Sequence, residues 1–418
     1  MLVAVLVIRP AGKLRYRTIL LTPTATGKDF VTIEQPEALV CAVLRREAPA
    51  WPWPGDAAAI ARFLEAGRRH GVVPLLHVEF RSGRDFSTWP AEVLETCHRV
   101  TMAQTVWELA HQAEIDRVLQ ALSDAGARPL VLKGGALAHS HYPDAMLRTR
   151  GDTDLLIPLH QREAAYRSLE ELGYALRPGS AGTLISYQSA WTRTDRRGAF
   201  HRLDVHWRIN NSQMLARKLG YDELAARAVS LPGIGPHALA LAPVDALLLA
   251  CIHRAGHVNA PFVAPDAAHP EENRLIWLYD IHLLATGMSA EELDAFAARA
   301  AAKQLRGICL EGLLRARERF ATPLSPAVLE ALAAPGPVEL SARYLSGGKI
   351  RQMVGDFLAL EGWADRLQWL REIAFPSAVH MRRKYPGAAV SWLPVLYVRR
   401  GLRAVWRLIT ARGAPRGH

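Results

Sequence analysis

The 418-residue sequence predicts an α/β protein, in which a small mixed sheet with helices is flanked by mainly helical regions. Three short apolar stretches bounded by turn residues are typical of buried strands: GARPLVL (126–132), DTDLLIP (152–158) and HRLDVHWRI (201–209). Apolar residues at helical spacing precede and follow these stretches. Beyond about residue 220, helix-start signals recur, which predicts a helical second half. A chain of this length accommodates two or three domains.

The first predicted unit, residues 1–95, contains short strands followed by helices. TILLTP (18–23) and FVTIEQ (30–35) have the β-branched and aromatic residues of strands. Residues 56–70 then have a helical pattern of apolar positions. This region carries no motif of its own that indicates chemistry.

The second predicted unit, residues 96–215, is the α/β core. It begins with a long amphipathic helix over about residues 100–125. The apolar positions of this helix include Ala103, Val106, Ala110, Ala113, Val118 and Leu122. The remaining predicted elements are, in order, a strand in 126–132, a short helix after Gly134-Gly135, a strand in 152–158, a helix over 160–172 and a strand in 201–209.

The third predicted unit, residues 216–340, is helical. Pro243 occupies the first position of one predicted helix, Ser289 and Glu292 form a capping box, and Ser325 precedes a proline that opens another helix. The last unit, residues 341–418, is predicted to be helical, basic and amphipathic.

The net charge of +11 is concentrated in this last unit. Residues 341–418 contain fourteen Lys and Arg but only four Asp and Glu, an excess of ten positive charges. An anionic partner is therefore expected there. The segment 392–413 mixes apolar and arginine positions without an acid, and three interpretations stay open. It can lie on an anionic membrane surface, bind a polyanion such as RNA, or pack on the body of the protein as a final helix.

A cytoplasmic location, with membrane association as an addition, is expected from the remaining composition. The four cysteines are scattered and form no CxxC pair, which suits a reducing compartment. The apolar stretch 1–8 is too short to cross a bilayer, and no uninterrupted apolar run of about 18 residues occurs elsewhere.

Two carboxylates in the sequence GDTDLLIP are the strongest indication of chemistry. Side chains alternate along a strand, so Asp152 and Asp154 should share a face. Burying two carboxylates side by side is costly unless a cation or hydrogen bonds offset their repulsion. Asp204, in the alternating sequence RLDVHW, would supply a third acid from an adjacent strand. Hard divalent cations, Mg²⁺ or Mn²⁺, are the expected ligands of this group, and all three aspartates are candidate metal ligands and catalytic residues.

Residues that could hold a phosphate chain precede the acids. Gly134 and Gly135, between a strand and a helix, would let backbone N–H groups approach a triphosphate. Lys133 and Arg148 would contact the same phosphates, although either can instead be an ion-pair partner of the aspartates. Arg150 is expected to be solvated. Together with the acids, these residues suggest two-metal phosphoryl or nucleotidyl transfer.

Three histidines have several interpretations. His206 shares the predicted face of Asp204, and can serve the site or only donate a hydrogen bond to a carboxylate. His253 and His257 lie four residues apart on one helix face. They can bind zinc, line a nucleotide or acceptor pocket, or simply pack, but the glutamate of an HExxH zinc motif is missing.

These motifs occur in an order that resembles the DNA polymerase β-like nucleotidyltransferase superfamily. The finer pattern is similar to a poorly characterised bacterial branch of nucleotidyltransferases. The matching segments are LKG (132–134), YP (142–143), RTRGDTD (148–154) and DVHW (204–207). The resemblance covers about residues 56–300, including the two-histidine helix and RLIWLYDIHLL (274–284), where Asp280 becomes a further candidate pocket residue.

The resemblance implies a nucleotidyltransferase core and transfer of a nucleoside monophosphate from an NTP to a hydroxyl on an unknown acceptor. It also implies members encoded beside genes for polysaccharide or peptide natural products, so the acceptor is expected to be a small molecule, peptide or glycan. Two other functions stay open. The same fold can transfer another group, such as a sugar or a phosphate, or the chain can be a non-catalytic module that binds nucleic acid or membrane.

Overall fold

The computed structural model describes residues 35–178, 184–259, 273–376 and 392–410, together with 3–5, 17–19, 378, 381–382 and 385. The strands β1 (Val3–Val5) and β2 (Arg17–Ile19) pair antiparallel at the N-terminus. β2 overlaps the start of the predicted strand 18–23. Most of the predicted strand 30–35, and the last eight residues of the basic tail, lie outside the described residues.

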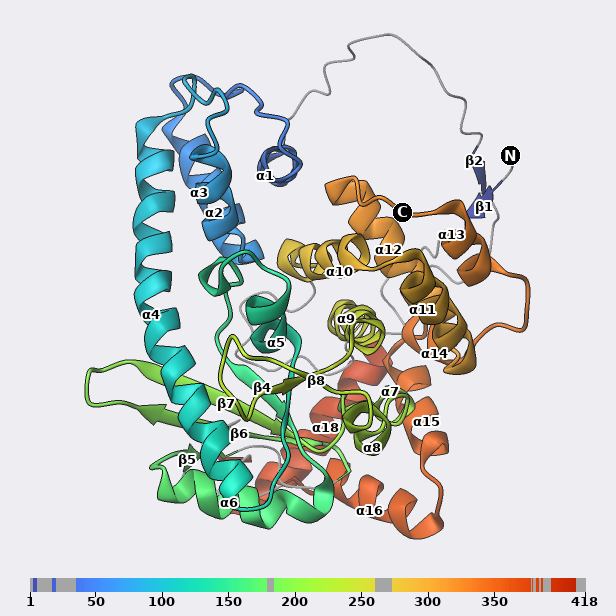
Figure 1. Ribbon diagram of the computed structural model, residues 1–418. Helices are drawn as coiled ribbons and strands as arrows, with labels where there is room; N and C mark the ends of the chain where they lie inside the picture. Colours follow the sequence, from blue (N-terminus) through green and yellow to red (C-terminus); the bar gives the residue numbers. More distant parts are fainter. Residues whose placement is uncertain are drawn as a thin grey trace.

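The described residues form a seven-stranded mixed sheet, which lies in the lower left of Figure 1 and confirms the predicted α/β class. Its central strands β7, β4 and β3 overlap the three predicted apolar stretches. β4 runs parallel to β7 and antiparallel to β3. In order across the sheet, the strands are β5 (Ala175–Leu176), β6 (Gln188–Thr194), β7 (Phe200–His206), β4 (Thr153–Leu156), β3 (Leu130–Leu132), β9 (Leu239–Ala240) and β8 (Val229–Ser230).

One face of this sheet packs against α4 (Ala91–Asp124) and α6 (Arg162–Glu171). Val131 and Leu155 point to this face, with Val118 and Leu122 of α4. The predicted helix 100–125 is therefore confirmed, but α4 begins nine residues earlier. Val106, counted among its apolar positions, is 70% exposed because only the C-terminal half of α4 covers the sheet.

The opposite face belongs to a second, larger core, which also contains Leu130, Leu132 and Leu156. Helices that precede the central strands in the sequence share this core with helices that follow them. The domain boundaries at 95, 215 and 340 therefore stay predictions. Among its helices are α1 (Pro36–Leu44), α2 (Ala57–His70), α3 (Val73–Phe80), α9 (Pro243–Val258), α10 (Leu275–Gly287), α11 (Ala290–Ala302), α12 (Arg306–Phe320) and α13 (Pro326–Ala333).

The predicted helix starts are confirmed. Pro243 occupies the first turn of α9, Ser289 and Glu292 form a capping box on α11, and Ser325 caps α13. The remaining helices are α5 (Lys133–Ser140), α7 (Gln213–Ala216), α8 (Tyr221–Ala225), α14 (Leu340–Leu345), α15 (Lys349–Ala359), α16 (Trp363–Ala374) and α18 (Leu393–Thr410). Among the described residues, none of the helices combines the length and apolar character needed to cross a membrane.

Candidate active site

Two of the predicted acids lie directly opposite each other in the sheet. Asp154 on β4 pairs in parallel register with Asp204 on β7. Both are buried, and they share their face of the sheet with His206, two residues further along β7. Ligand atoms of Asp154, Asp204 and His206 lie within 4.8 Å of one another, so the group could hold a metal ion.

Asp152 precedes β4 by one residue and lies at the rim of this group. Its side chain keeps 36% of its surface exposed, whereas that of Asp154 keeps 12%. The pKa of Asp152 is raised to about 6. Partial removal from water is the larger cause, and repulsion from the charges of Asp154 and Asp204 is the smaller one. The three carboxylates are thus close enough to influence one another electrostatically.

Cationic and amide side chains already compensate the buried acids. Lys133 Nζ and His206 Nε2 each lie 2.7 Å from Asp154 Oδ1, and together they hold the pKa of Asp154 well below its usual range despite burial. Arg202 Nη2 lies 3.1 Å from Asp204 Oδ2, so this acid also has a cationic partner. The Arg202 side chain is 35% exposed and therefore has room to turn away into solvent.

Lys133 has a backbone conformation that lysine rarely adopts. Its φ of +52° lies in the left-handed region, where a residue with a Cβ is strained by about 1–3 kcal/mol. The chain passes at this point from β3 directly into α5. The strained junction lets a strand-end lysine reach Asp154 on the neighbouring strand. Such strain is common at functional sites.

The Gly-Gly pair lies inside the first turn of α5 rather than in a loop between strand and helix, which corrects the predicted local structure. Both glycines are buried against protein atoms. A Cβ on Gly134 would come within 2.9 Å of Arg148 Cζ, and one on Gly135 within 3.2 Å of Thr153 Cγ2. Packing therefore requires glycine at 134 and favours it at 135, whether or not a phosphate binds here.

Arg148 lies beneath Gly134 in a buried network. Its Nε and Nη2 each donate to a different carboxylate oxygen of Asp280 at 2.7 Å, and its Nη1 donates to the carbonyl of Thr149. The Tyr142 hydroxyl donates to Asp280 at 2.8 Å. All three nitrogens of the guanidinium thus have protein acceptors. This arrangement favours a positioning role for Arg148 over direct contact with phosphates.

The prediction that Arg150 is solvated is wrong. Its side chain is 4% exposed and pairs with the equally buried Glu108 of α4 at 2.7 Å. The guanidinium also lies 5.6 Å from the ring centre of Trp107. The reason is tertiary, because α4 runs past the entry to β4 and presents a carboxylate and an aromatic ring there.

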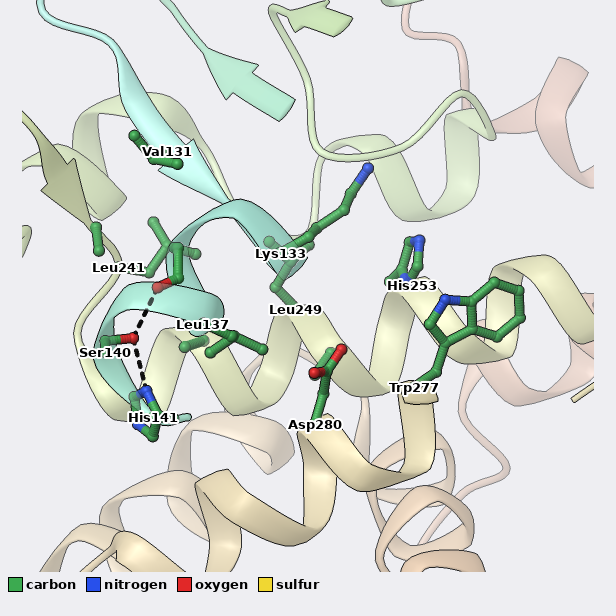
Figure 2. A pocket seen from close by; sticks show the side chains of 14 residues that line it. Val131, Lys133, Leu137, Ser140, His141, Leu241, Leu249, His253, Trp277 and Asp280 are labelled. Carbon is green, nitrogen blue, oxygen red and sulfur yellow. Dashed lines mark hydrogen bonds between the residues drawn. The ribbon is translucent and has the colours of Figure 1, made fainter. Parts of the chain in front are cut away.

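A pocket lies beside Lys133, the ion-pair partner of Asp154 (Figure 2). Lys133 of α5, His253 of α9, and Trp277 and Asp280 of α10 are among its lining residues. The rings of His253, His257 and Trp277 pack together, with centroids 4.5–5.2 Å apart. Burial lowers the pKa of His253 far below its usual value and that of His257 to about 4, so both rings are neutral at pH 7. In the part of the chain that the structure describes, the histidine pair is not part of a metal-ligand cluster.

Gln188 is one residue that the sequence did not single out. It lies on β6 next to β7, and its side-chain amide donates to Asp204 Oδ2 at 3.1 Å. Alternation along YQSAWTRT could have placed it on the face of the acids, since Gln188 pairs in register with His206. Nothing in the sequence alone specified that β6 would be the neighbour of β7.

A mixed sheet that holds opposed buried carboxylates beside a pocket has the form of a group-transfer site. A family model described as an uncharacterised nucleotidyltransferase matches residues 56–321, and the chain belongs to this family. It is thus an enzyme of the class that transfers nucleoside monophosphates from NTPs, generally with divalent metal ions. The match includes every acid of the site and the pocket histidines. No curated protein matches the chain.

Proposed function

We propose that the protein transfers a nucleoside monophosphate from an NTP to a hydroxyl group of an acceptor, and that Asp152, Asp154 and Asp204 hold the divalent cations. The in-register pairing of Asp154 with Asp204 beside His206 supports this proposal most strongly. Mg²⁺ or Mn²⁺, when bound, would neutralise the triphosphate and promote loss of the hydroxyl proton. Carboxylate oxygens are the donors that these hard cations prefer.

The surrounding side chains have separable roles in this proposal. His206 donates to Asp154 and fixes the orientation of that carboxylate. Asp204 either completes the metal site or accepts the proton of the attacking hydroxyl. Lys133, at the junction between the acids and the pocket, would contact a phosphate oxygen as a point charge. Arg202 can do the same once it leaves Asp204.

The phosphate-binding part of the proposal rests on the start of α5. Backbone N–H groups of Gly134 and Gly135 belong to the first turn of that helix, where amides lack intrahelical acceptors and favour anions. Arg148 would contribute indirectly, because its guanidinium packs against Gly134 and donates hydrogen bonds to Asp280.

The pocket beside Lys133 would hold the nucleobase or the acceptor. Trp277 and the neutral ring of His253 offer aromatic surface, and Ser140 and His141 offer polar atoms at the other end. A planar or apolar group therefore fits it better than a charged one. We propose that the acceptor comes from peptide natural-product or polysaccharide biosynthesis and that the reaction takes place in the cytoplasm, where the four buried free cysteines would stay reduced.

Pyrophosphate release measures the proposed reaction. The protein is incubated with each NTP, Mg²⁺ and pooled candidate acceptors, and compared with Asp152→Asn and with Asp294→Asn, an exposed acid remote from the sheet as a matched control. We expect Asp152→Asn to lose at least about a hundredfold in rate and Asp294→Asn to stay unchanged. Release that persists in Asp152→Asn would contradict the proposal.

Transfer of a sugar or a phosphate is an alternative that the same acids could support. Mass spectrometry of the acceptor distinguishes these reactions, because each adds a group of different mass.

Two of the acids already have cationic partners, in the pairs Lys133–Asp154 and Arg202–Asp204. Calorimetric titration with a non-hydrolysable NTP and Mg²⁺ therefore tests whether nucleotide binding depends on the metal, as the proposal requires.

A further inference from the structure

Most acids of the basic C-terminal region contact other parts of the protein, although the side chain of Glu361 stays 81% exposed. Asp356 is buried and accepts hydrogen bonds from Ser212 and Tyr344. Glu372 accepts the backbone N–H groups of residues 184 and 185, and Glu361 pairs with Arg217. Three of the four carboxylates in residues 341–418 are thus used in internal contacts.

Many arginines of the same region are exposed. Six of them are exposed: Arg343, Arg351, Arg371, Arg382, Arg399 and Arg403. Among the described side chains of this region, exposed arginines therefore outnumber exposed acids, since only Glu361 of the four acids is exposed. Such a surface attracts anions.

Apolar side chains lie exposed among these arginines on three helices, α15, α16 and α18. On α18, Val395, Val398 and Leu402 share one face and are 54–67% exposed. The opposite face is anchored, because Leu396 is buried and Tyr397 donates to the carbonyl of Pro376. The other exposed apolar residues of the region are Ile350, Val354, Leu358, Trp363, Leu367, Leu370, Phe375 and Trp392.

We infer that the exposed apolar and arginine side chains of α15, α16 and α18, which are labelled in Figure 1, bind the surface of an anionic lipid bilayer. Helices with an apolar stripe bordered by arginines lie in the plane of a membrane interface, with the apolar side chains among the acyl chains and the arginines at the headgroups. Trp363 and Trp392, 70% and 76% exposed, are of the residue type that prefers the headgroup level.

A bilayer fits these observations better than RNA does. A polyanion is bound by cations and stacked rings, and gains nothing from exposed valines and leucines. The inference goes beyond the proposed reaction, since it concerns where the enzyme acts.

Vesicle flotation tests the inference. The full-length protein is mixed with phosphatidylcholine vesicles, and separately with vesicles that also contain phosphatidylglycerol. We expect flotation with the anionic vesicles only, and loss of flotation at high salt. Val398→Asp and Leu402→Asp should each weaken partition at least about tenfold, whereas Val106→Asp, at an equally exposed valine on α4, should not.

Folding and competing partners are measured on the same samples. Melting temperatures of the three variants should match that of the unchanged protein, because all three sites are exposed. Equal binding to neutral vesicles, or flotation that Val398→Asp leaves intact, would overturn the inference. Tighter binding to a homopolymeric RNA than to anionic vesicles, unaffected by Val398→Asp, would also overturn the inference. So would light scattering that shows a dimer which Val398→Asp dissociates. None of these readouts depends on nucleotide chemistry, so the result is independent of the proposed reaction.

Discussion

At the scale of single residues, close packing explains features that a motif alone would assign to ligand binding. Gly134 has no room for a Cβ because the Arg148 guanidinium lies against it, and Lys133 adopts a strained φ to reach Asp154. Protein contacts thus constrain the residues of the LKGG segment before any substrate is present. A glycine in such a motif can be required for stability as well as for chemistry.

Gly134→Ala should destabilise the protein. The added methyl group would meet Arg148 at 2.9 Å, and overpacking of this kind costs about 1–3 kcal/mol. Gly151→Ala is the control, since open space surrounds that position in the same motif region. Urea unfolding of both variants measures the difference. Equal stability of the two would show that Arg148 moves aside without cost.

Lys133→Met distinguishes two roles of the lysine. It removes the charge 2.7 Å from Asp154 and leaves that buried carboxylate with His206 as its remaining close partner. If Lys133 contacts phosphate, KM for the NTP should rise at least about tenfold. If it only balances Asp154, Mg²⁺ should bind more tightly and KM should change little. Steady-state kinetics and a Mg²⁺ titration give both readouts.

At the scale of elements, one buried ion pair joins the sheet region to the helical core. Arg148 follows a short 3₁₀ turn before β4, and Asp280 lies on α10, 132 residues later. The pair contacts Gly134 on one side and the pocket on the other. It therefore couples the position of α5 to that of α10 and its aromatic residues.

Removing one partner of this pair should cost more than removing both. Arg148→Met leaves Asp280 buried without its cation, which typically costs about 3–5 kcal/mol. In the double variant with Asp280→Asn, which removes the unpaired charge, part of that loss should be recovered. Chemical denaturation of the two single variants and the double variant measures the coupling. Additive losses would mean that the pair contributes no coupling between the elements.

At the scale of the whole molecule, buried neutral histidines link folding to pH. His111 lies between Thr153 and His201, and its burial, with the charge of Arg150 nearby, lowers its pKa to about 2. An unfolded chain would protonate this histidine below about pH 6.5. The unfolded state thus binds more protons, so stability is fully present above pH 6.5 and falls as the pH is lowered.

His111→Gln should reduce the acid sensitivity of folding. Between pH 7 and pH 5 the histidine accounts for a loss of about 2 kcal/mol, which the variant should not show. The comparison uses the change with pH rather than the absolute stability, because the substitution also alters packing. The raised pKa of Asp152 makes folding more stable as the pH falls, but it does so equally in the unchanged protein and in the variant. Parallel stability curves would contradict the assignment.

Local pattern was sufficient to predict the central strands, the helix caps and the shared face of the acids. The apolar stretches at 126–132, 152–158 and 201–209 each overlap an observed strand of the sheet. Side-chain alternation placed Asp204 and His206 together, and the capping box at Ser289 predicted a helix start. These features depend on neighbours a few residues away, which a sequence displays directly.

Pairing between distant residues decided the rest. Burial of Arg150 depends on Glu108, 42 residues before it, and the role of Arg148 depends on Asp280, 132 residues after it. Charge pattern alone does not reveal such partners, since any arginine can be solvated until a carboxylate is brought to it. By itself, then, the sequence determined which residues could form a phosphoryl-transfer site. The tertiary structure decided which of the cations face the acids and which support the fold, because only the packing of α4, α5 and α10 sets the distances between charges.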